Sequence, residues 1–116
     1  MIKGIGIDII EIDRINDAVK KLGPRFLNKI FTENEIKYCT YKNKLKISEL
    51  AVRFAAKEAY SKAMGTGMVG ISWSQIEILN NQNGKPYIKI RGKAKKNIHI
   101  SLSHSASHAV ASVLIS

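Results

Sequence analysis

The chain has one cysteine, no long apolar run and few acidic residues, and each shortage excludes a class of protein. Cys39 has no partner for an intrachain disulfide, which agrees with a reducing compartment. No apolar stretch approaches the ~20 residues that a membrane-spanning helix needs. The N-terminal segment also lacks the charged, apolar and small-residue parts of a signal peptide. We therefore expect a cytoplasmic protein with no membrane partner.

Positive charge is in excess and unevenly distributed. The chain has 19 Lys and Arg against 9 Asp and Glu, which gives a formal net charge of +10. The last acidic residue is Glu77, and every charged residue after it is basic. Such a field favours an anionic partner and speeds its arrival. Charge alone does not distinguish nucleic acid, a phosphorylated small molecule and an acidic protein. The basic residues do lack the interleaved aromatics of a single-strand nucleic-acid platform.

The N-terminal segment predicts a buried strand over residues 2–10. Its residues alternate, with isoleucines on one face and Gly4, Gly6 and Asp8 on the other. Two residues without side chains therefore share a face with Asp8, which would leave room for a ligand beside this carboxylate.

After this strand, apolar residues recur at helical spacing as far as about residue 65, and from residue 71 they recur at every second position, as in a strand. We therefore predict a single compact α+β domain over residues 1–116. It would consist of one strand, several helices including a long buried one, and then a mainly antiparallel sheet. A capping box at residues 32–35 and an Asn-rich turn at residues 80–84 are the clearest local signals. The expected elements are helices at 12–22, 26–31 and 32 to about 41, a basic loop at 42–46, a long helix from a Ser48 cap to Gly65, and strands near 76–78, 87–90, 98–102 and 109–115.

Glu58 lies in the long predicted helix, which has almost no water-facing side. At 3.6 residues per turn, Glu58 and Lys62 fall one turn apart on a stripe of alanines. A buried carboxylate is normally paired or bound to a metal ion, because burying it alone is costly. Together with Asp8, it suits Mg²⁺, a hard cation that prefers oxygen ligands. The alternative is a set of internal ion pairs with the basic residues of the helix, Arg53, Lys57 and Lys62.

A glycine cluster, Gly65–Gly70, follows the long helix and matches the pattern G-x-G-x-x-G literally. That fingerprint has its dinucleotide-binding meaning only after a strand and at the start of a helix, so we reject a Rossmann fold. A helix C-cap followed by a turn explains the glycines equally well. Lys62 just upstream favours a phosphate site, because glycine amides and a lysine together suit phosphate oxygens.

The histidines and serines of the C-terminal region match no standard catalytic or metal pattern. The spacings of His99, His104 and His108 are not those of a zinc site. No acid follows Ser103-His104-Ser105 to complete a triad, so a serine hydrolase is not expected. Cys39 has no nearby histidine and is expected to be a small buried hydrophobe.

Short motifs follow one another along nearly the whole chain: Gly4-Ile-Gly-Ile-Asp8, Arg14-Ile15, Arg25-Phe26, Thr32-Glu-Asn-Glu35, Arg53-Phe-Ala-Ala-Lys-Glu-Ala59, Ser61-Lys62-Ala63, Gly65-Thr-Gly67, Asn83-Gly-Lys-Pro86 and Ser101-Leu-Ser-His-Ser105. Each one is weak, but their order and spacing are specific. Through these motifs, taken together in this order, the chain resembles the bacterial holo-[acyl-carrier-protein] synthases, which are the small phosphopantetheinyl transferases of fatty-acid synthesis. The resemblance implies the phosphopantetheinyl transferase fold. It also implies magnesium-dependent transfer of 4′-phosphopantetheine from coenzyme A to a serine of apo acyl carrier protein, releasing adenosine 3′,5′-bisphosphate.

The resemblance also implies roles for individual residues. Asp8 and Glu58 would hold Mg²⁺ against the diphosphate of coenzyme A, and Lys62 would stabilise charge on the phosphoryl oxygens. The serine proton would go to Glu58 or to a magnesium-bound water, a choice that the sequence leaves open. The residues implied at coenzyme A are Arg53, Lys62, Gly65, Gly67, Gly84, Lys85, Pro86, His104 and Ser105.

By the same resemblance, the partners are an acidic acyl carrier protein and further copies of this chain. Arg14, Lys21 and Arg25 would meet the acidic recognition helix of the carrier, where opposite charge steers docking. A homotrimer is implied, with coenzyme A in the clefts between protomers and no nucleic acid. Two positions depart from the family pattern: Lys29 replaces a common arginine, and His108 a frequent tyrosine.

Two other functions stay open at this level. A basic RNA- or DNA-binding module would lose affinity steeply with salt and ignore magnesium chelation. A nucleotide-binding regulator would bind coenzyme A without transferring its arm.

Overall fold

The computed structural model covers residues 1–116 and shows the predicted α+β order of strand, helices and strands. Strand β1 lies at one edge of a three-stranded antiparallel sheet of order β1-β8-β7, and β4, β5 and β6 form a second sheet. In chain order the elements are β1 (Gly4–Glu11), α1 (Ile12–Leu22), α2 (Pro24–Ile30), α3 (Glu33–Tyr38), β2 (Thr40–Tyr41), β3 (Lys44–Leu45), α4 (Ile47–Met64), the 3₁₀ turn η1 (Trp73–Gln75), β4 (Ile76–Asn80), β5 (Pro86–Ile90), β6 (Lys93–Ala94), β7 (Ile98–His104) and β8 (His108–Ile115).

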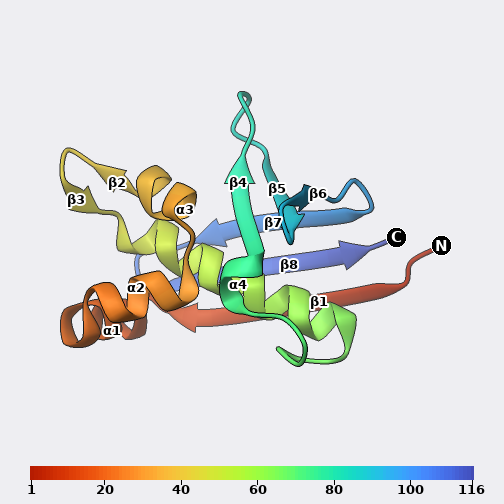
Figure 1. Cartoon of the computed structure of the whole chain (residues 1–116), viewed down its shortest axis with the longest axis horizontal. Coiled ribbons are helices and arrows are strands. Elements are labelled where there is room, and N and C mark those ends of the chain that lie inside the picture. The colour runs from red at the N-terminus through yellow and green to blue at the C-terminus, as the bar shows by residue number, and fades with distance from the viewer.

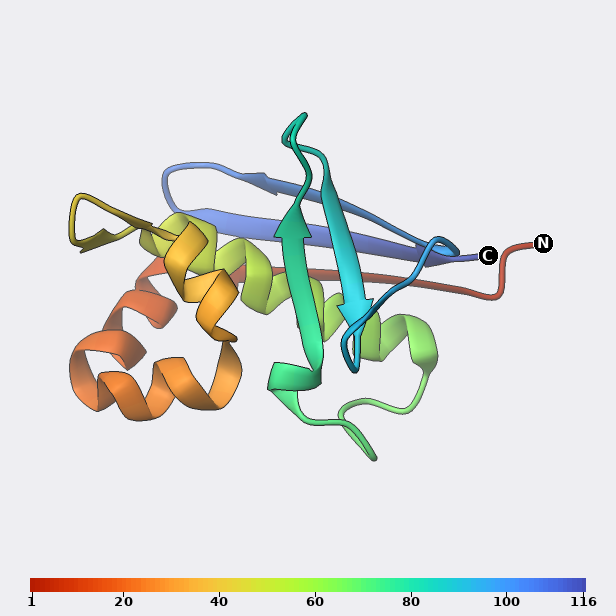
Figure 2. The same ribbon diagram turned by 45° about the horizontal axis from the view of Figure 1, so that its top comes forward.

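Helix α4 is the centre of the molecule. Figure 1 shows it running along one face of the β1-β8-β7 sheet, with α1, α2 and α3 gathered beside its N-terminal part. In Figure 2 the β4–β5 hairpin crosses α4, and both chain ends lie together near its C-terminal part. No helix combines the length and the apolar character needed to cross a membrane.

Strand β1 packs directly against the backbone of α4 because Gly4 and Gly6 face the helix. A Cβ atom added at Gly6 would lie 2.0 Å from the carbonyl oxygen of Ala59, and one added at Gly4 would lie 2.3 Å from that of Ala63. No side chain fits at either position. The sequence-based interpretation that these glycines leave room for a ligand is therefore wrong, because the helix itself fills that space. The close approach brings Asp8, the next residue on the same face, against α4.

The opposite face of the sheet has no helix over it. Ile5, Ile7 and Ile9 point from β1 to that side and are 71%, 63% and 65% exposed. The strand that was expected to be buried is thus covered on one face only within a single chain. Three large exposed apolar side chains in a row are typical of a surface that another molecule covers.

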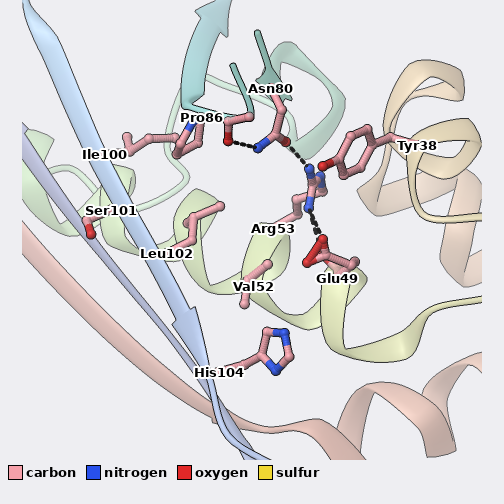
Figure 3. Close-up of a pocket in the computed structure, with 11 residues that line it drawn as sticks. Tyr38, Glu49, Val52, Arg53, Asn80, Pro86, Ile100, Ser101, Leu102 and His104 are labelled. Carbon is pink, nitrogen blue, oxygen red and sulfur yellow. Dashed lines mark hydrogen bonds and ion pairs between the residues drawn. The ribbon is translucent and has the colours of Figure 1, made fainter. Parts of the chain in front are cut away.

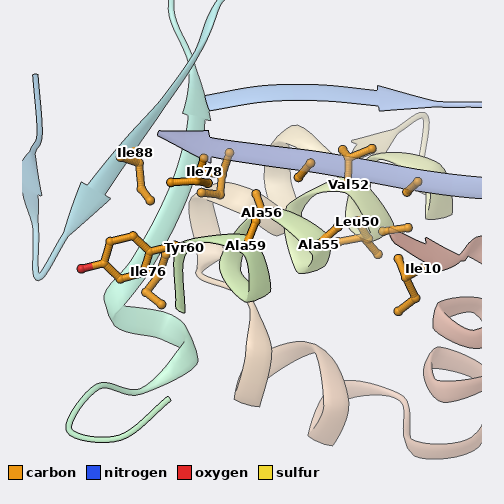
Figure 4. Packing of buried hydrophobic residues seen from close by; sticks show 14 of the residues in the cluster. Ile10, Leu50, Val52, Ala55, Ala56, Ala59, Tyr60, Ile76, Ile78 and Ile88 are labelled. Carbon is orange, nitrogen blue, oxygen red and sulfur yellow. The ribbon is translucent and has the colours of Figure 1, made fainter. Parts of the chain in front are cut away.

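The hydrophobic core lies between α4 and the two sheets (Figure 4). Alanines at 51, 55, 56 and 59 let strands approach α4 closely, and the second sheet contributes isoleucines at 76, 78, 88 and 90. The central strand β8 contributes every second residue from Ala109 to Ile115, as its alternating burial requires. Cys39 is fully buried in this core, and burial raises the pKa of its thiol to about 12, which confirms the hydrophobic role expected for it.

A buried ion pair joins α4 to the small helices. Lys57 Nζ lies 2.7 Å from the Glu35 carboxylate, and both side chains are fully buried. The same ammonium donates to the carbonyl oxygens of Ile30 and Trp73, at 2.7 and 3.1 Å. Glu35 accepts two further hydrogen bonds, from a backbone N–H at the cap of α3 and from one in β4. Burial lowers the pKa of Lys57, although Glu35 opposes this. The pair therefore fixes α2, α3, η1 and β4 on the central helix.

Two predicted boundaries were wrong. The long helix begins at Ile47 after a Lys46 cap, so Ser48 lies inside it and does not cap it. Helix α3 has the predicted capping box but ends at Tyr38, because Thr40 and Tyr41 pair with residues 44–45 in a small hairpin. The predicted basic loop is the turn of this hairpin, in which Lys42 and Asn43 have positive φ.

Gly6→Ala is expected to lower the free energy of unfolding by about 3 kcal/mol or more, because the new methyl group must push β1 away from α4. Chemical denaturation followed by circular dichroism measures the change. Gln82→Ala, at an exposed position in the β4–β5 turn, is the control and is expected to stay within about 0.5 kcal/mol of the parent protein. Parent-like stability of Gly6→Ala would contradict the close packing of β1 on α4.

Candidate functional site

Asp8, Glu58 and Lys62 form one charged cluster where β1 meets α4. Lys62 Nζ donates to Asp8 Oδ1 and to the carbonyl oxygen of Ile7, each at 3.0 Å. The Asp8 side chain is mostly buried, at 16% exposure, whereas Lys62 is about half exposed, at 53%. The structure thus brings together the three residues that the sequence predicted as catalytic.

Glu58 is the carboxylate without a partner in this cluster. Its side chain makes no ion pair or hydrogen bond, although it is half-buried in α4. Burial and then the negative charge of Asp8 raise the pKa of Glu58, and Lys62 offsets part of this rise. Two carboxylates close enough to repel each other favour the arrival of a cation.

The ion pairs of α4 show that one of the internal pairs considered from the sequence, Lys62 with Asp8, is formed. Lys57 forms its ion pair with Glu35, and Arg53 forms one with Glu49 at 3.9 Å. Neither of these basic side chains pairs with Asp8 or Glu58. Only Lys62 pairs with one of the two acids. No group of three or more His, Cys, Asp or Glu side chains could hold a metal ion. Two oxygen-donor side chains therefore fit a cation that takes its remaining ligands from water and substrate, as Mg²⁺ does.

A separate cavity of about 360 Å³ lies on the other side of α4, between that helix, the β4–β5 hairpin and β7 (Figure 3). Four residues predicted from the sequence line it: Arg53, Gly84, Pro86 and His104. Its other lining residues are Tyr38, Glu49, Val52, Asn80, Ile100, Ser101 and Leu102.

Arg53 is the buried cation of this cavity, at 1% exposure. Its Nη1 donates to the carbonyl oxygen of Glu49 at 3.1 Å, and its Nη2 donates to Asn80 Oδ1. The Tyr38 ring lies 4.4 Å from the guanidinium carbon and forms a cation–π contact. Nε is the one nitrogen of this group that lacks an acceptor. Since buried donors are normally satisfied, an unpaired one is consistent with a binding site.

The remaining predicted residues lie near these two sites but not in the same cavity. Lys85 lines a neighbouring pocket of about 390 Å³ that shares Pro86 as a wall. Ser105 lies in the β7–β8 turn, where its Oγ accepts hydrogen bonds from the backbone N–H groups of residues 107 and 108. Gly65 and Gly67 lie in the exposed loop after α4, both with positive φ, and Gly65 caps the helix in the left-handed conformation. The C-cap interpretation is thus correct for Gly65.

The basic residues predicted for a partner lie on the surface of α1 and α2. Arg14, Lys21 and Arg25 are all exposed. Arg25 and Lys29 border a hollow of about 390 Å³ whose apolar walls are Leu22, Phe26, Ile30 and Trp73. Positive charge around an apolar hollow suits an acidic, amphipathic partner. His108, the other departure from the family pattern, is exposed, and its Nδ1 lies 2.8 Å from Ser107 Oγ.

Of the seven lining residues that the sequence did not predict, three hold the Arg53 side chain: Tyr38, Glu49 and Asn80. Glu49 had a usable signal, because it lies four residues before Arg53 on one helix and such pairs face each other. Asn80 reads only as a turn residue, and nothing in the chain links Tyr38 to Arg53.

Comparison with known proteins gives one consistent result. A model of the 4′-phosphopantetheinyl transferase superfamily matches residues 4–113. The "Holo-[acyl-carrier-protein] synthase" of Halothermothrix orenii is 47% identical over 122 residues, covering 98% of this chain and 97% of the relative. The protein of the same name from Anoxybacillus flavithermus is 48% identical over 117 residues, covering 99% and 96%.

Solved structures agree with this result. A Bacillus anthracis holo-(acyl-carrier-protein) synthase in complex with CoA (3′,5′-ADP) has a TM-score of 0.81 at 42% identity, covering 99% of this chain and 96% of its own. A Neisseria meningitidis holo-[acyl-carrier-protein] synthase has a TM-score of 0.86 at 34% identity, covering 100% and 99%. The Helicobacter pylori protein in complex with coenzyme A has a TM-score of 0.81 at 34% identity, covering 97% and 99%.

The charged cluster predicts opposite effects of two substitutions on Glu58. Asp8→Asn is expected to lower the pKa of Glu58, because it removes a neighbouring negative charge, and Lys62→Met is expected to raise it.

The folded-state pKa of Glu58 lies above its unfolded value. Its contribution to stability is therefore fully present below the unfolded pKa and is lost as the pH rises through the folded pKa. Titration of the side-chain carboxyl carbon by NMR in metal-free protein measures the shifts. An unchanged pKa in both variants would contradict the coupling of the three groups.

Proposed function

The chain belongs to the 4′-phosphopantetheinyl transferase superfamily, and on this premise we propose that it is a holo-[acyl-carrier-protein] synthase. It transfers the 4′-phosphopantetheine arm of coenzyme A to a serine hydroxyl of apo acyl carrier protein and releases adenosine 3′,5′-bisphosphate. The main support is nearly full-length similarity to proteins of that name together with the Asp8, Glu58 and Lys62 cluster. Similar structures contain coenzyme A, which supports it as the donor.

The cluster suits the chemistry of this reaction. The bond between the phosphorus of the arm and the bridging oxygen of the diphosphate breaks, and that oxygen leaves with adenosine 3′,5′-bisphosphate. A new bond forms between the serine oxygen and the phosphorus of the arm, and the serine proton passes to Glu58 or to a water molecule. Such a step requires chiefly positioning and neutralisation of charge. Asp8 and Glu58 would hold Mg²⁺, which supplies positive charge at the diphosphate when bound. Lys62, held by Asp8 and half exposed, places a second positive charge there.

The cavity around Arg53 suits the nucleotide end of the donor. Arg53 and His104 provide polar contacts, and Gly84 and Pro86 form a wall from the β4–β5 turn. Lys85 and Ser105 are next to lining residues in the chain, and we propose that they add polar groups at its rim. Gly65 and Gly67, in the loop after Lys62, would let the chain pass close to the transferred arm.

One chain alone does not complete the site. Arg53 and Lys62 are nine residues apart on α4, and at about 100° per residue they point to opposite sides of the helix, roughly 13 Å apart along its axis. The cluster lies beside β1 and the cavity beside β7, which are the two edges of one sheet. A cleft between two copies would join the cluster of one protomer to the cavity of the next. This arrangement supports a homotrimer with sites between protomers.

The uncovered face of the β1-β8-β7 sheet supports the same assembly. Its row of exposed isoleucines is continued by Val110 and Leu114 of β8, which lie opposite Ile9 and Ile5 in the ladder. A shallow cavity of about 190 Å³ on this face is lined by Ile5, His99, Ile100, Ser101, Ser112, Val113 and Leu114. Burial of this surface against other copies would add apolar area to a small core.

The carrier protein would dock on α1 and α2. Arg14, Lys21 and Arg25 would attract its acidic helix, and the hollow beside Phe26 would receive an apolar side chain. Lys29 keeps the charge at this hollow but lacks the bidentate geometry of an arginine. We place the reaction in fatty-acid biosynthesis in the cytoplasm, where the carrier supplies the serine.

The transfer reaction is tested directly by mass spectrometry. Apo acyl carrier protein mixed with coenzyme A, Mg²⁺ and this protein is expected to gain one phosphopantetheine. Glu58→Gln is expected to lower kcat/KM by roughly 100-fold or more, since it removes a charged ligand. Glu33→Gln, an exposed acid on α3, is the matched control and is expected to be as active as the parent protein.

Two outcomes would contradict this function, and a third would contradict only the metal role. Absence of any mass gain would exclude the transfer and leave the coenzyme A-binding regulator. Salt-sensitive nucleic-acid binding that ignores chelation would favour the nucleic-acid module. Full turnover by Glu58→Gln would remove the metal role alone.

The assembly predicts that Ile7→Arg converts the protein to a monomer and abolishes transfer, because a charge on the uncovered sheet face cannot be buried without a partner. Light scattering after size-exclusion chromatography measures the oligomeric state. Val69→Arg, at an 80% exposed position in the loop after α4, is the control for oligomeric state. A parent protein that is monomeric, or an Ile7→Arg variant that stays trimeric, would contradict the assignment of this face.

A further inference from the structure

Asn80 connects the buried cation of the cavity to the turn that forms its wall. Its Oδ1 accepts a hydrogen bond from Arg53 Nη2, and its Nδ2 donates to the carbonyl oxygen of Gly84 at 2.9 Å. Figure 3 shows the resulting chain of contacts from Glu49 through Arg53 to Asn80 and on to the turn. Arg53 and Gly84 both line the cavity, so this one side chain fixes two of its walls relative to each other.

The amide is chemically suited to this position. A neutral oxygen can orient a guanidinium without cancelling its charge, whereas a carboxylate at the same place would neutralise it. The nearest carboxylate, Glu49, is 3.9 Å from Arg53 Nη1 and is itself partly exposed. Glu49 thus offsets part of the charge of Arg53, and the rest stays available to an anionic ligand. The guanidinium is oriented by the Glu49 carbonyl oxygen, by Asn80 and by the Tyr38 ring.

We infer that Asn80 is a positioning residue for substrate binding, which holds Arg53 and the β4–β5 turn in the geometry that binds the phosphorylated nucleotide end of coenzyme A. The inference rests on the proposed function. It assigns Asn80 a role in binding the donor and none in the chemical step, because the charged cluster lies on the other side of α4.

Calorimetric titration with adenosine 3′,5′-bisphosphate tests this role. Asn80→Ala is expected to raise its Kd about tenfold, and to raise the KM for coenzyme A similarly with kcat within about twofold. Asn80→Asp keeps an acceptor for Arg53 but adds a negative charge, so it is expected to bind the nucleotide still more weakly. Asn28→Ala, at an exposed position on α2, is the matched control and is expected to bind like the parent protein.

A double-mutant cycle identifies the residue through which Asn80 acts. In an Arg53→Met background, Asn80→Ala is expected to change Kd by less than about twofold, because the group that it positions is gone. Thermal unfolding of each variant shows whether it is folded, and if Asn80→Ala is not, Asn80→Ser replaces it, because serine is neutral and too short to reach both Arg53 and the Gly84 carbonyl oxygen.

Unchanged Kd in both Asn80 variants, fully additive effects with Arg53→Met, or a loss confined to kcat would each overturn the role of Asn80 while leaving the transfer function standing. A parent protein that neither binds the nucleotide nor transfers the arm would overturn both.

Discussion

The direct contact between β1 and α4 is the constraint on which the rest of the structure depends. Gly4 and Gly6 have no side chains and let the backbone of β1 contact the backbone of α4. Asp8 follows Gly6 on the same face of the strand and therefore lies beside Lys62. As a result, burial and then the negative charge of Asp8 raise the pKa of Glu58. Asp8 is thus held close to Glu58, which is distant in the sequence, because the backbones of β1 and α4 are in contact. Such close packing tolerates little displacement. The cation site that we propose depends on that geometry.

Much of the fold could be predicted because its local signals agree with its tertiary structure. Alternation in β1 and β8, the capping box at Thr32 and the Asn-rich hairpin all match the observed elements. The start of α4 could not be found from Ser48, since the chain enters the helix from the β2–β3 hairpin. The role of the glycines was misread for a related reason: a missing side chain suits a ligand or a helix equally, and only packing distinguishes them.

The sequence predicts which residues belong to the proposed site, but not that they lie in two separate places, the charged cluster and the Arg53 cavity. Asp8, Glu58 and Lys62 are marked by being charged in apolar surroundings, and Arg53 by lying in the same helix. Helix geometry alone predicts that Arg53 points to the opposite side of α4 from Lys62. The sequence does not show that β1 and β7 lie at opposite edges of the sheet, which is what separates the charged cluster from the cavity. The contacts that hold Arg53 come from α3 and the β4–β5 turn, and no local pattern in the sequence reports them.

A crystal structure of the protein with Mg²⁺ and coenzyme A tests the central claim most directly. The account predicts one ion coordinated by oxygens of both Asp8 and Glu58 of the same protomer at about 2.0–2.1 Å, with β1 and α4 in the contact described here. An ion held elsewhere, or held by only one of these carboxylates while the other remains turned away, would contradict it.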